Sequence, residues 1–181
     1  MNGSKIALWL AGAALTLLAA GRWMPAQAGE DATITRALSV WVAQGSTFKT
    51  GAQEATFVGS LAGPIFVDTE KGLVESGRMI CPTIVEIGLD DGKQQARGRC
   101  TITARDGALL FAEISCAGVF MVGCKGDIKF TGGTERFDKI TGGGKALIRS
   151  DVVRFVPAGE HVAAGDGTGI LVLTGIHYKM P

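Results

Sequence analysis

Closely spaced turn signals constrain this chain more than any other feature of its sequence. They lie at Asp90-Asp91-Gly92, Arg105-Asp106-Gly107, Gly142-Gly143-Gly144 and Gly165-Asp166-Gly167. Asp-Gly is a strong hairpin signal, because the tight turn between two strands requires positive φ angles that these residues tolerate. The runs between the signals are short or alternate in polarity, and none has a long helical period. The sequence therefore predicts an all-β domain.

Nine candidate strands fit between these turns, and the short connections favour pairing between consecutive strands. About eight antiparallel strands in a meander would close into a barrel and leave no exposed edge. We therefore expect a single closed antiparallel barrel. The candidate strands are Ala37–Val42, Ala55–Ser60, Pro64–Val67, Met79–Ile87, Gln94–Ala104, Ala108–Cys116, Lys125–Thr131, Lys145–Phe155 and Thr168–Tyr178.

The first 28 residues have the features of a cleaved signal peptide. Lys5 supplies a positive n-region, Ile6–Ala20 is apolar, and Ala26-Gln27-Ala28 places small residues at the cleavage positions. The apolar run, which Arg22 ends, is shorter than the roughly 20 residues of a transmembrane helix. We therefore expect a periplasmic or secreted protein with a signal peptide at 1–28, a β-barrel domain at 29–181, and no membrane span after cleavage.

The charge of the exported part excludes one class of partner. Cleavage would remove two of the 18 basic residues and none of the 17 acidic ones, so the formal net charge would fall from +1 to −1. A nearly neutral chain has no general electrostatic attraction to nucleic acid or to anionic lipid. We therefore expect no nucleic-acid partner.

All four cysteines, Cys81, Cys100, Cys116 and Cys124, follow the predicted signal peptide. None belongs to a CxxC pair, which disfavours zinc and thioredoxin chemistry. An even number of cysteines in an oxidising compartment favours disulfides. Three pairings are possible, and we favour Cys81–Cys100 with Cys116–Cys124, because each pair flanks a predicted chain reversal.

Glu113 is the candidate catalytic residue, and its role depends on which strand face lines the barrel. Along residues 108–116, Leu110 and Ile114 share one face, whereas Glu113 shares the other with Phe111. If Glu113 faced the interior, its carboxylate could serve as an acid or base for a bound ligand. If the Leu110 face lined the interior, Glu113 would lie outside and be inert. We favour the second arrangement, since antiparallel sheets commonly keep one wet face. The same outer face is expected for Glu86, Arg97, Arg99, Arg149 and Arg154.

The glycines and histidines fit no cofactor, metal or nucleophile motif. Gly144-Lys145 is followed by Ala146 and precedes a strand, whereas a Walker A motif requires Ser or Thr there and a helix afterwards. The run 165–169 also leads into a strand, which disfavours a dinucleotide site. His161 and His177 have no partner motif, so we expect surface or structural roles for both. We predict no cofactor and no metal site.

The segment Gly126–Gly144, GDIKFTGGTERFDKITGGG, resembles a glycine-rich GGTG-x-F…G strand-turn pattern. That pattern belongs to the allene oxide cyclase and dirigent-protein superfamily of barrels, and the chain is also similar to small exported bacterial proteins of unassigned function. Glu135 stands where the pattern usually has glycine, so a different turn geometry is expected there. The resemblance implies a calycin-like, eight-stranded barrel with a central cavity. The superfamily includes a fatty-acid-epoxide cyclase and proteins that steer radical coupling, but none of their catalytic residues maps onto this chain.

Three functions are compatible with these features. We favour a non-enzymatic exported barrel that binds a small apolar or amphipathic molecule or a partner protein. The alternatives are a cyclase or isomerase that uses the cavity with Glu113 or Glu86, and a structural accessory subunit of a periplasmic complex. A binder or an enzyme requires a pocket of several hundred Å³ with a few convergent polar groups. An accessory subunit requires a filled barrel and an exposed apolar patch.

Overall fold

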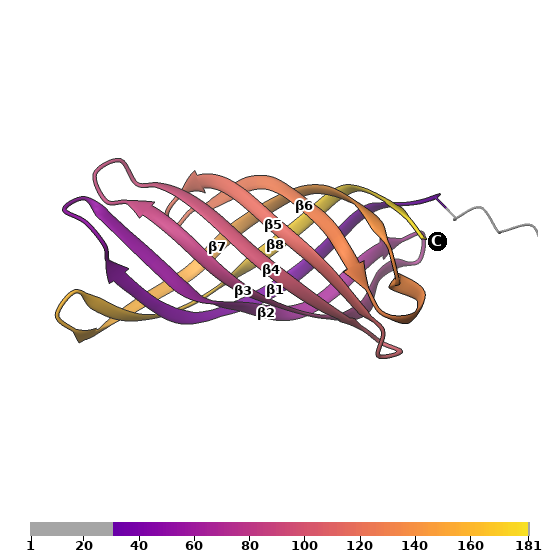
Figure 1. The fold of residues 1–181 in the computed structure, drawn as a ribbon, viewed down its shortest axis with the longest axis horizontal. Coiled ribbons are helices and arrows are strands. Elements are labelled where there is room, and N and C mark those ends of the chain that lie inside the picture. The colour runs from indigo at the N-terminus through magenta and orange to yellow at the C-terminus, as the bar shows by residue number, and fades with distance from the viewer. Residues whose placement is uncertain (1–30, 181) are drawn as a thin grey trace, which may run out of the picture.

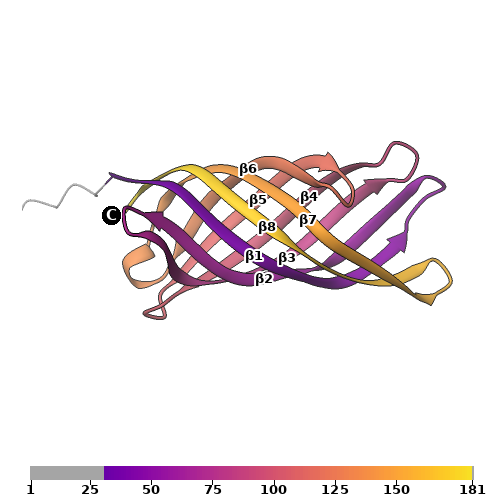
Figure 2. The ribbon, with the colours of Figure 1, turned by 180° about the vertical axis from the view of Figure 1, so that it is seen from behind.

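Eight antiparallel strands form a closed ring in the structure, a computed structural model that describes residues 31–180. Each strand pairs with its neighbours in the sequence, and β1 closes the barrel against β8 (Figure 1, Figure 2). This confirms the predicted antiparallel barrel, whereas the predicted signal peptide lies outside the described residues. The elements are β1 (Asp31–Lys49), β2 (Glu54–Thr69), β3 (Gly72–Gly88), β4 (Lys93–Ala104), β5 (Leu109–Val119), β6 (Gly123–Gly133), the 3₁₀ helix η1 (Glu135–Phe137), β7 (Thr141–Gly159) and β8 (Val162–Lys179).

The strands are longer than predicted, and β2 joins two of the nine candidates. The two candidates were separated at Gly63 and Pro64, but β2 continues through both residues. The pairing of β2 with β1 is interrupted there, between Ala62 and Ile65. Proline has no N–H to donate to a ladder, so it is tolerated where a ladder is interrupted. Within residues 31–180, no helix has the length and apolar character needed to cross a bilayer.

Two of the predicted turns are instead parts of strands. Gly142–Gly144 lies in β7, where the register with β8 shifts, and Gly165–Gly167 lies in β8. The strand backbones approach closely at these glycines, since a Cβ at Gly143 would collide with the carbonyl oxygen of Ile128. Glycine inside a strand commonly marks a bulge or a close backbone approach. The turn between β7 and β8 lies at Glu160-His161 instead.

Side chains alternate between the interior and the outer wall as the sequence predicts. On β4, Cys100 and Ile102 are buried, and on β5, Leu110 and Ile114 are buried. The apolar face of each strand therefore lines the barrel, which is the second of the two arrangements considered above. A continuous apolar core of buried side chains occupies the middle of the barrel and the end at which β1 begins and β8 finishes.

The outer wall of β8, β1, β2 and β3 is unusually apolar. Val40 and Ile170 lie opposite each other across β1 and β8, and Val58 and Ile84 lie opposite each other across β2 and β3. All four side chains are exposed, as is Ile80 on β3. Exposed apolar side chains that gather on one surface commonly mark an interaction site.

Candidate ligand-binding cavity

One end of the barrel is closed by the chain between β6 and β7. Figure 1 shows η1 at the end where β8 finishes, opposite the β1–β2, β3–β4 and β7–β8 hairpins. Phe137 of η1 packs against the core, and Ile140, which follows it, is only 3% exposed. Thr134 attaches this segment to β5, because its backbone N–H donates to the Leu109 carbonyl at 2.8 Å and its hydroxyl accepts from the Leu109 N–H at 2.9 Å. We call this the closed end.

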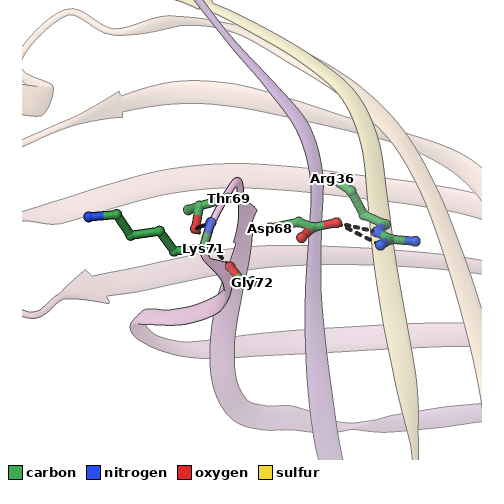
Figure 3. Close-up of polar contacts among 5 residues, drawn as sticks. All are labelled: Arg36, Asp68, Thr69, Lys71 and Gly72. Carbon is green, nitrogen blue, oxygen red and sulfur yellow. Dashed lines mark hydrogen bonds and ion pairs between the residues drawn. The ribbon is translucent and has the colours of Figure 1, made fainter.

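Polar contacts also order the β2–β3 turn at the closed end (Figure 3). Arg36 of β1 donates to the Asp68 carboxylate of β2 through Nε at 3.0 Å and Nη2 at 2.6 Å. In the turn itself, the Thr69 hydroxyl donates to the Gly72 carbonyl at 2.8 Å and accepts from the Lys71 N–H at 3.2 Å. This is the local bonding by which Thr stabilises tight turns.

The opposite end opens into an apolar cavity. The cavity has a volume of ≈ 120 Å³. Trp41, Met79 and Leu171 line its deep wall, where they also belong to the barrel core. The remaining wall is mainly apolar and includes three phenylalanines, Phe57, Phe120 and Phe155. We call this the open end.

Glycines beside Trp41 and Phe57 leave room for the aromatic side chains that line the cavity. Trp41 of β1 lies directly opposite Gly169 of β8, and a Cβ at Gly169 would collide with the indole ring. Phe57 lies against Gly45 and Gly59 in the same manner. Because glycine has no side chain, each ring can lie flat against the backbone and leave the interior empty. The sequence analysis missed this arrangement, whose only signal is a tryptophan on an otherwise small-residue face of β1.

The indole N–H of Trp41 is a buried donor without an acceptor. The residue is 4% exposed, and among the described residues Nε1 has no hydrogen-bond partner. Buried tryptophan N–H groups usually find a partner. Thr83, another polar lining residue, is buried and donates its hydroxyl to the Cys81 carbonyl at 2.9 Å. The cavity wall is therefore mainly apolar, and the buried Trp41 N–H is unpaired within the described part of the chain.

An ion pair lies at the mouth of the cavity. Asp166 of β8 is a lining residue, and its Oδ2 accepts from Arg154 Nη2 at 2.6 Å and from Nε at 3.2 Å. The hydrogen bond and the attraction to the Asp166 carboxylate raise the pKa of Arg154. Nearby, the rings of Phe120 and Phe155 lie 5.9 Å apart. The Asp166 carboxylate is therefore already paired with the Arg154 guanidinium.

Both disulfides lie in the cavity wall. Cys81 of β3 is bonded to Cys100 of β4, and Cys116 of β5 is bonded to Cys124 of β6. These are the two pairs that the sequence analysis favours, and all four cysteines line the cavity. Each bond joins neighbouring strands and so restricts their separation around the hollow part of the barrel.

The structure places the candidate catalytic residue outside the barrel. Glu113 lies on the outer wall of β5, its side chain is 50% exposed, and its Oε1 is 3.2 Å from Arg99 Nε. Arg99, Glu113 and Lys129 are paired side by side across β4, β5 and β6, so opposite charges neighbour each other. An interior role for Glu113 is therefore wrong, because the pleat of β5 directs Leu110 and Ile114 inward. Glu86 is exposed as well.

The histidines have the surface positions that the sequence predicts. His161 lies in the β7–β8 turn at a positive φ of 65°, and its side chain is 63% exposed. His177 is exposed on β8, with Nδ1 3.1 Å from the Thr33 hydroxyl oxygen. Among residues 31–180, no group of three or more potential metal ligands is close enough to hold an ion.

Comparisons with known proteins identify no family for this chain. No family model matches it, and no curated protein matches it. Among solved structures, it is similar to a pterocarpan synthase dirigent protein at 12% sequence identity and a TM-score of 0.35, over 81% of this chain and 93% of that chain. A likeness this distant carries no argument about function, and the superfamily resemblance of Gly126–Gly144 stays a prediction.

Proposed function

We propose that this protein is an exported, non-enzymatic barrel that binds a small apolar or amphipathic molecule in its open-end cavity. The observation that carries the proposal is the cavity itself, which is apolar, contains few polar groups and opens at only one described end. Ligand sites in proteins are typically concavities lined mainly by apolar side chains with a few polar groups. The signal-peptide pattern at 1–28 and the two disulfides support an extracytoplasmic location.

The enzyme alternative has no comparable support. Glu113 and Glu86 lie on the outer wall, and Asp166 at the mouth is paired with Arg154. A cyclase or isomerase that depends on an interior carboxylate would need such a group beside the ligand. The described lining therefore favours binding without turnover.

One of the two structural requirements of the accessory-subunit alternative is fulfilled. It requires a filled barrel and an exposed apolar patch; exposed apolar side chains lie on the outer wall, whereas the barrel retains a cavity of ≈ 120 Å³. The patch includes Val40, Val58, Ile80, Ile84 and Ile170. A partner protein that covers this outer wall would be compatible with a ligand in the cavity, because the two surfaces lie on opposite sides of the sheet.

Native mass spectrometry of protein purified from its source tests the proposal. We expect a co-purified small molecule on the wild-type chain. It should be lost from Ala43→Phe, which fills the cavity from its wall, and retained by Ala117→Phe, which adds the same ring to the exposed face of β5. A stoichiometric protein without any small molecule would favour the accessory subunit. Equal occupancy of the two variants would contradict binding in the cavity.

A further inference from the structure

The outer surface of the barrel has two unlike walls. On β4 to β7 the outward positions carry many charges, such as Arg99, Glu113 and Lys129, which lie in one cross-strand row. On β1 to β3, several successive outward positions are apolar, and they neighbour one another across the strands. We call this second wall the apolar panel, and its members are Val40, Val42, Val58, Ala62, Ile80 and Ile84.

The members of the apolar panel are held in solvent by the pleat of the strands. Five of the six are between 47% and 54% exposed, and only Ala62 is less exposed. On β3 they alternate with Met79 and Cys81, which are buried in the barrel. The panel therefore cannot turn inward, and apolar surface that extends over several strands is typical of a contact with another protein.

Strand β3 carries opposite charges at the two ends of its apolar run. Its outward positions are, in order, Arg78, Ile80, Pro82, Ile84 and Glu86, and all five are exposed. Within residues 31–180, neither Arg78 nor Glu86 belongs to an ion pair. Pro82 is the midpoint of the run. A second β3 laid across it in the reverse direction would therefore place Arg78 of each copy against Glu86 of the other.

The neighbouring strand is complementary to itself about the same midpoint. Reversal about the row of Pro82 places Val58 of one copy against Ala62 of the other, and Ile80 against Ile84. A larger side chain on β2 then faces a smaller one, and apolar groups face apolar groups. A different protein would not require the panel to match itself. The pattern therefore favours a second copy of this chain, since a two-fold contact uses the same patch on both subunits.

The extent of the panel suits a stable contact. Glu86 follows Arg78 by eight positions, which is about 26 Å along a strand. A patch of this width corresponds to the roughly 800 Å² that each partner buries in a standard interface. An apolar centre with charged groups at its rim is also the usual composition of such an interface.

We propose that the apolar panel is the interface of a two-fold symmetric homodimer. Strand β3 of one protomer runs antiparallel to β3 of its partner across the interface, and Arg78 of each protomer forms an ion pair with Glu86 of the other. The dimer does not depend on the proposed ligand, because the panel lies on the outside of the barrel and the cavity lies within it.

Sedimentation equilibrium of the purified protein, with a matched pair of variants, tests the location of the contact. Val58 in the panel is 47% exposed, and Val119 at the end of β5, away from the panel, is 50% exposed. We expect a dimer for the wild type and for Val119→Glu. Val58→Glu should raise the dissociation constant at least about a hundredfold, because each dimer would bury two carboxylates without a counter-charge. A wild type that is monomeric at about 100 μM, or a dimer that survives Val58→Glu, would overturn the proposal.

Reversing the charges on β3 tests the direction of packing. Arg78→Glu should weaken the dimer about tenfold, because two exposed attractions become repulsions. The double variant Arg78→Glu with Glu86→Arg restores opposite charges in exchanged positions, so its dissociation constant should return to within about threefold of the wild type. A dimer insensitive to Arg78→Glu, a double variant no tighter than the single one, or a trimeric mass would overturn the antiparallel two-fold arrangement.

Discussion

The closed end and the open end of this barrel are stabilised by different means. At the closed end, η1 and Ile140 cover a core of interdigitated apolar side chains. At the open end, aromatic rings lie against glycines around empty space, and two disulfides join the strands of the wall. Empty space forfeits the dispersion contacts that a filled core provides. A disulfide acts mainly by restricting the unfolded chain, so it stabilises a wall that has little behind it. The comparison shows how one barrel can be filled at one end and hollow at the other.

Truncating one phenylalanine at each end is the strongest test of this difference. Phe130 is 7% exposed and contacts Tyr178 at 6.5 Å between ring centroids, whereas Phe155 at the mouth is 37% exposed. We expect Phe130→Ala to lower the free energy of unfolding by about 3–5 kcal/mol. Phe155→Ala should lower it by only about 1–2 kcal/mol, because the ring is already partly exposed to water. Urea unfolding measures both, and equal losses would show that the two ends are packed alike.

Removing the disulfides should weaken the open end selectively. The bonded cysteines are 19 residues apart in Cys81–Cys100 and 8 apart in Cys116–Cys124. Loop-closure entropy predicts losses of about 3 and about 2.5 kcal/mol when each pair is replaced by alanines. Amide hydrogen exchange should accelerate mostly around the cavity. An acceleration as large at η1 and at the β2–β3 turn would contradict a local role for the disulfides.

Replacing Glu135 at the closed end should have a smaller effect on stability, and the effect should be an increase. The sequence predicted a turn geometry unlike that of glycine, but Glu135 has a φ of 53°, in the region that glycine favours. We expect Glu135→Gly to stabilise the protein by about 0.5–1 kcal/mol, since a non-glycine residue is strained there. Glu135→Ala is the matched control, because it keeps the Cβ and should not relieve the strain. Thermal unfolding is measured for the wild type, Glu135→Gly and Glu135→Ala. A gain in stability for Glu135→Ala would show that loss of the charge, and not relief of backbone strain, stabilises the protein.

Substitutions on the outer wall should have the smallest effect on stability. Glu113→Gln breaks the ion pair with Arg99, in which the two side chains are 50% and 86% exposed. Exposed pairs contribute little, so we expect a change in unfolding free energy of about 0.5 kcal/mol or less. Affinity for cavity ligands should be unchanged within error. A loss of ligand affinity would restore a functional role for Glu113.

Much of the fold could be predicted because its signals are local. Alternation along residues 94–104 and 108–116 indicates which side chains share a face, and the disulfide pairs follow from cysteines that flank a reversal. The glycine clusters were misjudged as turns. Gly142–Gly144 and Gly165–Gly167 are needed for contacts with other strands, and no local pattern distinguishes that need from a turn.

The candidate site was the least predictable part. Glu113 drew attention as a carboxylate in a strand, yet its position depends on which face of the closed ring turns inward. Trp41 drew none, because its significance depends on Gly169, 128 residues later in the chain and directly opposite it across β1 and β8. Alternation defines two faces but does not say that part of the inner one borders empty space.

The sequence by itself determined an all-β chain with short turns, a signal-peptide pattern, two locally favoured disulfides and an exposed position for most strand charges. Periodicity and turn chemistry act over a few residues, and a reader of the sequence can see both. Only the tertiary structure decided that the ring closes with one end filled and the other hollow, and that Trp41 packs against the backbone of Gly169. These features depend on register and packing between strands far apart in the chain, which no single segment encodes.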